Sequence, residues 1–262
     1  MNSRPIASLS SALHDPQLRQ RLQRASARLL ALDYDGTLAP FQVERMQAAP
    51  LPGVLAQLRR IAAGDTRLVL VSGRPIDELL KLLGELPLLM IGSHGSELRR
   101  PDGTRENHAA DPRQAAGLDL GEQAITRLAH GASWERKLSS VALHTRGMDQ
   151  STAKELEDRA CREFKSLAVQ HGLECRRFNG GVELRTLGRH KGLALQPLID
   201  GLPTDGLAVY IGDDETDEDA FTALGDHGVG IKVGTAGHAS IARYALADCA
   251  EVLQFLDDWP VR

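Results

Sequence analysis

The chain has 262 residues, of which 42% are hydrophobic and 25% are charged, as in ordinary soluble globular proteins and unlike disordered chains or coiled coils. Its formal net charge of -4 provides no overall field that would attract nucleic acid or an anionic membrane surface. An anionic substrate would therefore need a local cationic pocket. The three cysteines are widely spaced and include no C-x-x-C pair, which argues against a disulfide framework or a zinc site.

The sequence has no apolar signal-peptide core near its start and no apolar stretch approaching the roughly 18 residues that span a bilayer. Its cysteine usage fits a reducing compartment. We therefore expect a cytoplasmic, monomeric protein that binds neither nucleic acid nor membrane. The length predicts one or two domains.

Strand and helix patterns alternate along most of the chain. Leucines at helical spacing over residues 13–27 predict a leading helix, and residues 54–63 and 76–83 also carry helical patterns. Short runs that are apolar on both faces predict buried strands at residues 28–32, 68–71, 88–91 and 207–211. This alternation predicts an α/β fold with a doubly wound, mostly parallel sheet that binds ligands at the carboxyl ends of its strands.

The middle of the chain has a different pattern. Residues 101–112 are rich in Pro, Asp, Gly and Asn and are predicted to form a loop. Residues 139–145 and 182–185 alternate as strands with one wet face do. A capping box at residues 152–155 predicts the start of a helix that ends at Gly172.

These two patterns predict two domains. Residues 102–186 would form a smaller inserted α+β cap domain that recognises the substrate. Residues 1–101 and 187–262 would together form the catalytic core.

Two carboxylates follow the first buried strand. Asp33 and Asp35 belong to a D-x-D-G-T segment, and a turn there can direct one carboxylate to each side of a bound group. An aspartate can attack phosphorus to give an aspartyl-phosphate, while a second carboxylate protonates the leaving oxygen and later deprotonates the attacking water. Mg²⁺ suits such a site because it binds carboxylate and phosphate oxygens. The alternative is that both aspartates only cap the turn.

A second acidic segment follows the strand at residues 207–211. Six of the seven residues from 213 to 219 are acidic, and a bound cation would offset their repulsion. Asp213, at the strand tip, is the better candidate for a metal ligand. Asp217 and the two acidic residues after it could instead favour the first turn of the helix predicted near Ala220.

Groups that can bind phosphate follow two other elements. Ser72, Gly73 and Arg74 end the strand at residues 68–71, where a hydroxyl and backbone N–H groups at a helix N-terminus form an anion site. Lys191 opens another helix and can neutralise phosphate as a point charge. Taken singly, Ser72 could be a helix cap and Lys191 a solvated surface residue.

Together and in order, these four segments resemble the D-x-D-G-T, S-G-R, Lys and G-D-D-x-x-D motifs of the haloacid dehalogenase superfamily of phosphatases. The resemblance implies that Asp33 is the nucleophile and Asp35 the general acid/base. It also implies that Ser72 and Lys191 are catalytic residues that contact the phosphate. The implied ligands of Mg²⁺ are Asp33, the Asp35 carbonyl and Asp213, with Asp217 in support.

Three segments are more narrowly similar to the trehalose-6-phosphate phosphatase family. Residues 135–146 resemble the E-x-K…S-V-A-x-H-x-R segment of its cap, residues 92–97 its G-x-H-G-x-E, and residues 212–221 its G-D-D-x-T-D-E-D-x-F. The resemblance implies a small sugar phosphate, trehalose 6-phosphate, as the partner and Mg²⁺ as the cofactor. The residues implied to bind substrate are Gly73, Arg74, His94, Glu97, Glu135, Lys137, Arg146 and Glu183.

Other interpretations remain open. Glu135, Lys137 and Arg146 could form salt links on an exposed sheet face, and Glu183 could be part of a structural ion pair. Thr186 stands where the family commonly has proline. The substrate could be another sugar phosphate such as sucrose 6-phosphate, or the core could serve a phosphomutase. A sugar-phosphate sensor on an inactive scaffold is disfavoured because every motif residue is present.

Overall fold

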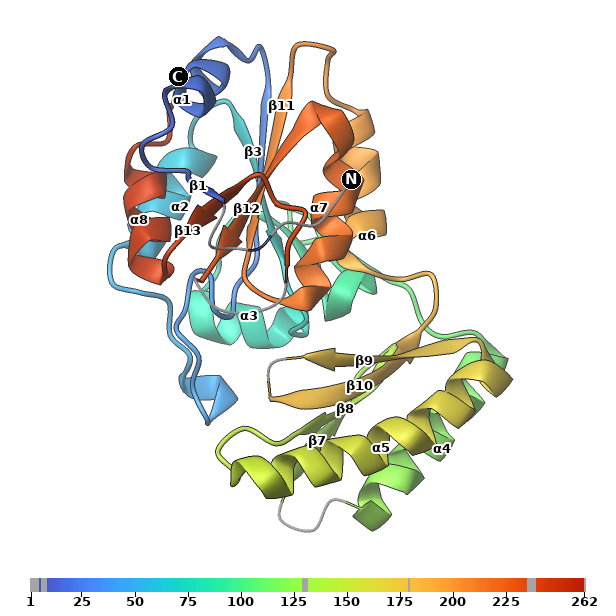
Figure 1. Cartoon of the computed structure of the whole chain (residues 1–262). Coiled ribbons are helices and arrows are strands. Elements are labelled where there is room, and N and C mark those ends of the chain that lie inside the picture. The colour runs from blue at the N-terminus through green and yellow to red at the C-terminus, as the bar shows by residue number, and fades with distance from the viewer. Residues whose placement is uncertain (1–4, 6–8, 129–131, 179, 235–238, 262) are drawn as a thin grey trace. The chain divides into compact units, whose positions relative to one another are not determined.

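The structure is a computed structural model that describes residues 5, 9–128, 132–178, 180–234 and 239–261. The chain divides into two compact units, one of Met1–Glu106 with His190–Arg262 and one of Asn107–Arg189. Among the described residues, the first unit is built on a nine-stranded sheet and the second on a four-stranded sheet (Figure 1).

The larger sheet is mostly parallel. Neighbouring strands pair in parallel from β1 through to β4, and β4 pairs with β5 in the antiparallel sense. In spatial order the strands are β1 (Ser10–Ser11), β13 (Tyr244–Leu246), β12 (Gly228–Val233), β11 (Leu207–Gly212), β2 (Arg28–Leu32), β3 (Thr66–Val71), β4 (Leu89–Gly92), β5 (Glu97–Arg99) and β6 (Arg105–Asn107).

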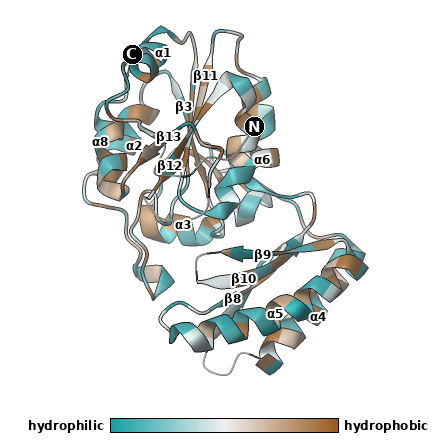
Figure 2. Cartoon of the chain, in the orientation of Figure 1, coloured by the Kyte–Doolittle hydropathy of each residue, from teal (hydrophilic) through white to brown (hydrophobic). Residues whose placement is uncertain are grey.

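Helices cover both faces of this sheet. One face packs against α1 (Pro16–Arg24), α2 (Val54–Ala62), α3 (Ile76–Leu83) and α8 (Cys249–Asp257), and the other against α6 (Lys191–Asp200) and α7 (Glu218–Leu224). Successive residues of β2 alternate between the two apolar clusters, Leu30 in one and Leu29 in the other, because strand side chains point to opposite faces in turn. Figure 2 shows the hydrophobic residues along these strands. The predicted doubly wound α/β core is confirmed.

The register of the central strands determines where the polar residues meet. Leu32 lies opposite Ile211 of β11 and opposite Leu70 of β3, so the three strands end at nearly the same level. Because the three strands run parallel, the residues that follow them emerge together at the carboxyl ends. Two short turns at this edge carry polar residues, η3 (Ser93–Gly95) after β4 and η4 (Glu215–Asp217) after β11.

The smaller unit has an antiparallel sheet with helices on one face. Its strands lie in the order β7 (Ser133–Arg136), β8 (Ser140–His144), β10 (Gly181–Thr186) and β9 (Leu173–Phe178). Helices α4 (Pro112–Leu128) and α5 (Gln150–His171) pack on that face through a cluster that includes Leu118, Phe164 and Leu184. Glycine at 172 ends α5 in the left-handed conformation (φ 67°), as predicted.

Two local predictions were wrong. Helix α5 begins at Gln150 and not at the box at 152–155, because the Asp149 carboxylate accepts hydrogen bonds from the backbone N–H groups of Ser151 and Thr152. The predicted loop at residues 101–112 contains the short strand β6, which extends the larger sheet. Short polar strands carry no hydrophobic alternation, so the composition of this segment gave no sign of one.

The strand predicted at residues 182–185 also differs, because every residue of β10 is buried where one wet face was expected. The charged side chains buried there have hydrogen-bond partners. Ser140 Oγ donates to Glu183 Oε1 at 2.7 Å, and Arg185 Nε donates to Glu174 Oε1 at 2.7 Å. Alternation in the sequence identified the two faces but not their exposure.

No helix among the described residues is long and apolar enough to cross a membrane.

Candidate active site

Asp33 lies at the end of β2 and is buried. Its backbone N–H donates to the carbonyl of Ile211 at 2.9 Å, which extends the ladder between β2 and β11 by one residue. The ammonium of Lys191, at the first position of α6, lies 2.8 Å from Asp33 Oδ1 and 2.6 Å from Asp217 Oδ1. A lysine 158 residues away in sequence is thus buried against the expected nucleophile.

Asp217 accepts three hydrogen bonds through its two carboxylate oxygens. Oδ1 accepts from Lys191 Nζ and from the hydroxyl of Tyr210 at 2.5 Å, and Oδ2 accepts from the backbone N–H of Asp214 at 2.9 Å. The side chain is fully buried. Asp217 therefore holds Lys191 and the turn after β11 in place, which is more than the helix-capping role considered for it.

Tyr210 and Lys232 also belong to the site, although no motif in the sequence indicated them. Tyr210 lies in β11 and is fully buried, and Lys232 Nζ, at the end of β12, donates to the Asp214 carbonyl at 3.1 Å. Each is a polar residue in an otherwise apolar strand. This polar residue type was the one sign in the sequence that each belongs to a polar site, because a buried hydroxyl or ammonium needs a hydrogen-bond partner.

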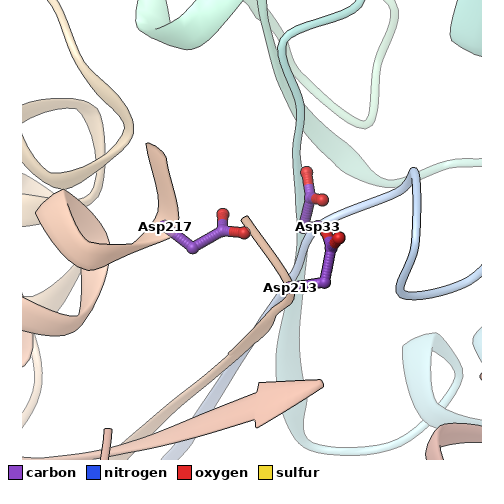
Figure 3. Close-up of side chains that lie close together, drawn as sticks. All are labelled: Asp33, Asp213 and Asp217. Atoms are coloured by element: carbon purple, nitrogen blue, oxygen red, sulfur yellow. The ribbon is translucent and has the colours of Figure 1, made fainter. Parts of the chain in front are cut away.

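Carboxylates of Asp33, Asp213 and Asp217 provide oxygen atoms that all lie within 4.8 Å of one another (Figure 3). Asp213 Oδ1 is buried and accepts no hydrogen bond from the described residues. Gly36, in the turn after Asp33, has φ 73°, and a Cβ atom there would lie 2.3 Å from Asp213 Oδ2. Glycine is therefore needed at this position, both for the backbone conformation and for the close approach of the turn to the Asp213 carboxylate. Hard carboxylate oxygens with an unsatisfied acceptor fit a divalent cation such as Mg²⁺ or Ca²⁺.

The charges at this site are unbalanced. Burial raises the pKa of Asp33 to about 7, although the Lys191 charge opposes this shift. Burial, reinforced by the charge of Asp33, also raises the pKa of Asp213 well above its ordinary value. Burial would raise the pKa of Asp217 too, but the charge of Lys191 outweighs it and lowers that pKa. One lysine thus compensates one carboxylate, and the remaining carboxyl groups favour a bound cation.

Arg74 binds the second aspartate of the motif. Its Nε and Nη2 atoms donate to the two carboxylate oxygens of Asp35 at 2.6 and 2.7 Å. The buried guanidinium also donates to Glu78 at 3.3 Å and to the carbonyl of Arg45 at 2.9 Å. In this structure two of its donors fix Asp35, and the predicted contact of Arg74 with substrate stays a prediction.

Ser72 is buried after β3, and its Oγ accepts the backbone N–H of Arg74 at 3.1 Å, so it also acts as a local cap. Gly73 lies against the ring of His94, where an added Cβ would come within 2.5 Å of ring atoms. His94 has φ 55° in η3, which holds its ring at that position. Ser72, Gly73 and His94 therefore lie together beside the β3 and β4 strand ends.

Glu97 is engaged within the core. Its carboxylate accepts hydrogen bonds from the Ser93 hydroxyl and from the backbone N–H of Ile76 at 3.3 Å. These bonds tie the turn after β4 to the start of α3. These contacts give Glu97 a structural role, and its predicted contact with substrate stays a prediction.

In the smaller unit, three of the predicted substrate residues form one cluster. Glu135 and Glu183 both pair with Ala142 of β8, so they lie on the same face of the sheet with a small residue between them. Lys137 Nζ lies 2.8 Å from Glu135 Oε1 and 3.4 Å from Glu183 Oε1. Ser140 adds the hydrogen bond to Glu183 described above.

The fourth residue, Arg146, lies at the other end of β10. Its side chain is placed beside Gly180, where a Cβ would be 3.3 Å from Arg146 Nε. The structure therefore groups the Glu135, Lys137 and Glu183 side chains and places Arg146 on the turn that follows β8.

The parallel sheet with acidic residues at its strand ends and an inserted second unit has the haloacid dehalogenase-like hydrolase fold. A hydrolase of that kind from B. subtilis superposes with a TM-score of 0.64 over 87% of this chain and 98% of its own, at 15% identity. The trehalose-phosphatase family model matches residues 31–250, and the chain belongs to that family.

Two trehalose-phosphate phosphatases show how far the likeness extends. The protein from Mycobacterium marinum is 35% identical over 240 residues, which cover 85% of this chain and 59% of the relative. The chain thus spans about three-fifths of the length of that relative. The C-terminal domain of trehalose-6-phosphate phosphatase from Candida albicans superposes with a TM-score of 0.83 over 98% of both chains, at 23% identity. Membership implies a divalent metal, which the acidic cluster fits.

Proposed function

We propose that this chain hydrolyses trehalose 6-phosphate to trehalose and phosphate, through an aspartyl-phosphate on Asp33 and with Mg²⁺ as its metal. The observation that carries the proposal is the buried Asp33 carboxylate, held by Lys191 beside Asp213 at a strand end. Membership in the trehalose-phosphatase family supports the choice of substrate. The monomeric state and cytoplasmic location remain predictions.

The proposed chemistry needs two carboxylates. Asp33 attacks phosphorus, the bond to the sugar oxygen breaks, and Asp35 gives that oxygen a proton. Asp35 then takes a proton from water, whose oxygen attacks the phosphorus of the aspartyl-phosphate and frees phosphate and Asp33. Arg74 orients Asp35 for both proton transfers through its two hydrogen bonds. Lys191 orients Asp33 and offsets its charge.

Mg²⁺ would be held by Asp33, Asp213 and the backbone carbonyl of Asp35, with Asp217 in support. When bound, it neutralises charge on the phosphoryl group and orients its oxygens. The unsatisfied Asp213 Oδ1 and the raised pKa of Asp213 are the features of this chain that a cation would relieve.

Sugar specificity is assigned to the smaller unit. Glu135, Lys137 and Glu183 present two carboxylates and an ammonium on one sheet face, and such groups hydrogen-bond to adjacent sugar hydroxyls. We propose that they bind the disaccharide, together with Arg146. Ser72, Gly73 and His94 would contribute to binding the phosphate end.

A phosphate-release panel tests the proposed function. Purified protein is incubated with trehalose 6-phosphate, sucrose 6-phosphate, glucose 6-phosphate and p-nitrophenyl phosphate, each with Mg²⁺ and with chelator. We expect the highest kcat/KM for trehalose 6-phosphate with Mg²⁺. A preference for another sugar phosphate would reject the substrate, and transfer of phosphate to sugar without release would indicate a phosphomutase.

Removing the metal ligand at the strand tip should weaken metal binding. Asp213→Ala is expected to raise the Mg²⁺ concentration needed for half-maximal activity, because the carboxylate whose buried Oδ1 has no hydrogen-bond partner among the described residues is lost. Glu215→Ala, an exposed residue of the same acidic segment, is the matched control and should change little. Ca²⁺ should inhibit, because its larger and looser coordination misplaces the reacting groups. Full activity in excess chelator would contradict the metal requirement.

Truncating the cluster in the smaller unit should affect only the sugar substrate. Glu135→Ala or Lys137→Ala should lower kcat/KM for trehalose 6-phosphate by roughly 10- to 1000-fold, because the sugar loses a charged hydrogen-bond partner. The rate with p-nitrophenyl phosphate, which has no sugar, should barely change. Lys154→Ala, an exposed residue of α5, serves as control. Equal losses on both esters would show that the cluster supports folding and does not recognise the sugar.

A further inference from the structure

Two cysteines meet inside the smaller unit. Cys161 on α5 and Cys175 on β9 are free thiols, and their sulfur atoms lie 3.4 Å apart. Cys175 pairs with Leu184 of β10, so both cysteines lie on the helix-covered side of the sheet. Cys161 is buried, whereas Cys175 is partly exposed. Cys175 is thus the more exposed residue of the pair, and its sulfur is in contact with that of the buried Cys161.

The elements that carry them hold this contact. Helix α5 packs along β9 and β10 through Leu156, Ala160 and Phe164. Arg177, two residues after Cys175, also binds α5 through Glu157 at 3.2 Å and Asp158 at 2.5 Å. A disulfide bond requires the sulfur atoms to approach to about 2.05 Å, and side-chain rotation can provide much of the remaining distance.

We propose that Cys161 and Cys175 form a redox-modification site, in which a peroxide converts the two thiols into one intramolecular disulfide. The partly exposed Cys175 sulfur attacks the peroxide, becomes a sulfenic acid and releases water or an alcohol. Cys161 sulfur then attacks the Cys175 sulfur and expels hydroxide, which takes up the thiol proton to become water. Two thiols are oxidised by two electrons, and one peroxide is reduced.

The buried environment of the two thiols makes disulfide formation slow, so the pair is not suited to rapid sensing of peroxide. Burial, and next the hydrogen bond with Cys161, raise the pKa of Cys175 to about 12, although Lys165 and Arg177 oppose the shift. Only a small fraction of this thiol is ionised at neutral pH, so the first step is slow. The second step is intramolecular and needs no diffusion, so a sulfenic acid at Cys175 closes to the disulfide before it is oxidised further.

The bond would connect the helix layer to the sheet within one unit. It closes a short loop that contains the end of α5 and the turn at Gly172. Cross-linking over such a loop restricts the unfolded chain, and a rise of roughly 5–15 °C in Tm is expected. The cross-link lies on the face opposite Glu183, since neighbouring residues of β10 point to opposite faces.

Peptide mapping of the full chain tests the proposal. Protein is treated with hydrogen peroxide, alkylated in denaturant and digested without reductant. We expect the peptides containing Cys161 and Cys175 to be joined, one remaining free thiol per chain in place of three, and reversal by dithiothreitol together with the loss of the added thermal stability.

The third cysteine provides the matched control. Burial raises the pKa of Cys249 to about 11, and its sulfur makes no sulfur contact among the described residues. Cys249→Ala should still form the disulfide, and Cys161→Ala should not. Unmodified thiols throughout, a bond that includes Cys249, or a link between two chains would each overturn the proposal. Wild-type mapping decides this even where a variant folds poorly, and none of these results depends on phosphatase activity.

Discussion

Asp33→Asn is expected to lower kcat for trehalose 6-phosphate by several orders of magnitude, because the amide lacks the negative charge that attacks phosphorus. Phosphate release measured under saturating substrate and Mg²⁺ checks the size of the loss. After rapid quenching in acid, the wild type should carry protein-bound phosphate that hydroxylamine releases, as an acyl phosphate does, and the variant should carry none.

The fold should survive this change. Asparagine retains an oxygen that can accept from Lys191, and Lys191 keeps its bond to Asp217. Burial raises the pKa of Asp33 from 3.8 to about 7 in the folded state. Between these two pH values Asp33 loses its proton in the unfolded chain and keeps it in the folded chain, so the free energy of unfolding of the wild type falls as the pH rises. Without metal, the neutral variant should therefore have a Tm at pH 7 no lower than that of the wild type. Substantial activity in a preparation free of wild-type protein would contradict the assignment of Asp33.

The apolar strands and the chemistry-bearing strand ends could be predicted from sequence. Residues 29–32 are apolar on both faces because β2 is covered by helices on both sides, and this is the pattern that a central parallel strand requires. The polar residues that follow such strands emerge at one edge. For this reason Asp33, Ser72 and Asp213, which lie far apart in the chain, could be assigned to one site before their contacts were known. Lys191 begins a helix, and the order of the four motifs assigned it to the same site.

The pairing of side chains within that site could not be predicted. Arg74 was assigned to the substrate because it follows Ser72 in a recognised motif, yet it binds Asp35, 39 residues earlier. Likewise, the sequence shows Tyr210 only as an aromatic residue in a buried strand, and its role follows from the hydrogen bond that its hydroxyl donates to Asp217. Such pairings depend on the three-dimensional positions of donors and acceptors, which neither hydrophobic period nor motif spacing specifies.

Helix starts show the same limit on a smaller scale. The predicted box at residues 152–155 and the carboxylate of Asp149 both satisfy the preferences of a helix N-terminus. Asp149 caps the helix in the structure and accepts from two backbone N–H groups. Competing caps a few residues apart differ little in free energy, so sequence preference alone does not choose between them.

Asp35→Asn is expected to slow both chemical steps, each by roughly 10²–10⁴-fold, the range typical of general acid–base catalysis. The amide cannot donate a proton to the leaving sugar oxygen, and it cannot accept one from the attacking water. Arg74 should stay in place, since it keeps its bonds to Glu78 and to the carbonyl of Arg45. A loss of activity without a large fall in Tm would therefore report on chemistry.

Two esters separate the acid role of Asp35 from its positioning role. The aryl leaving group of p-nitrophenyl phosphate departs without a proton, so formation of the aspartyl-phosphate from this ester should slow much less than from trehalose 6-phosphate. Hydrolysis of the aspartyl-phosphate still needs the base, so with the aryl ester the variant should show a burst of nitrophenol followed by slow turnover. Rapid-mixing measurements on both esters resolve the two steps. Equal slowing of the first step for both esters would show that Asp35, held by Arg74, orients the phosphoryl group and is not the acid.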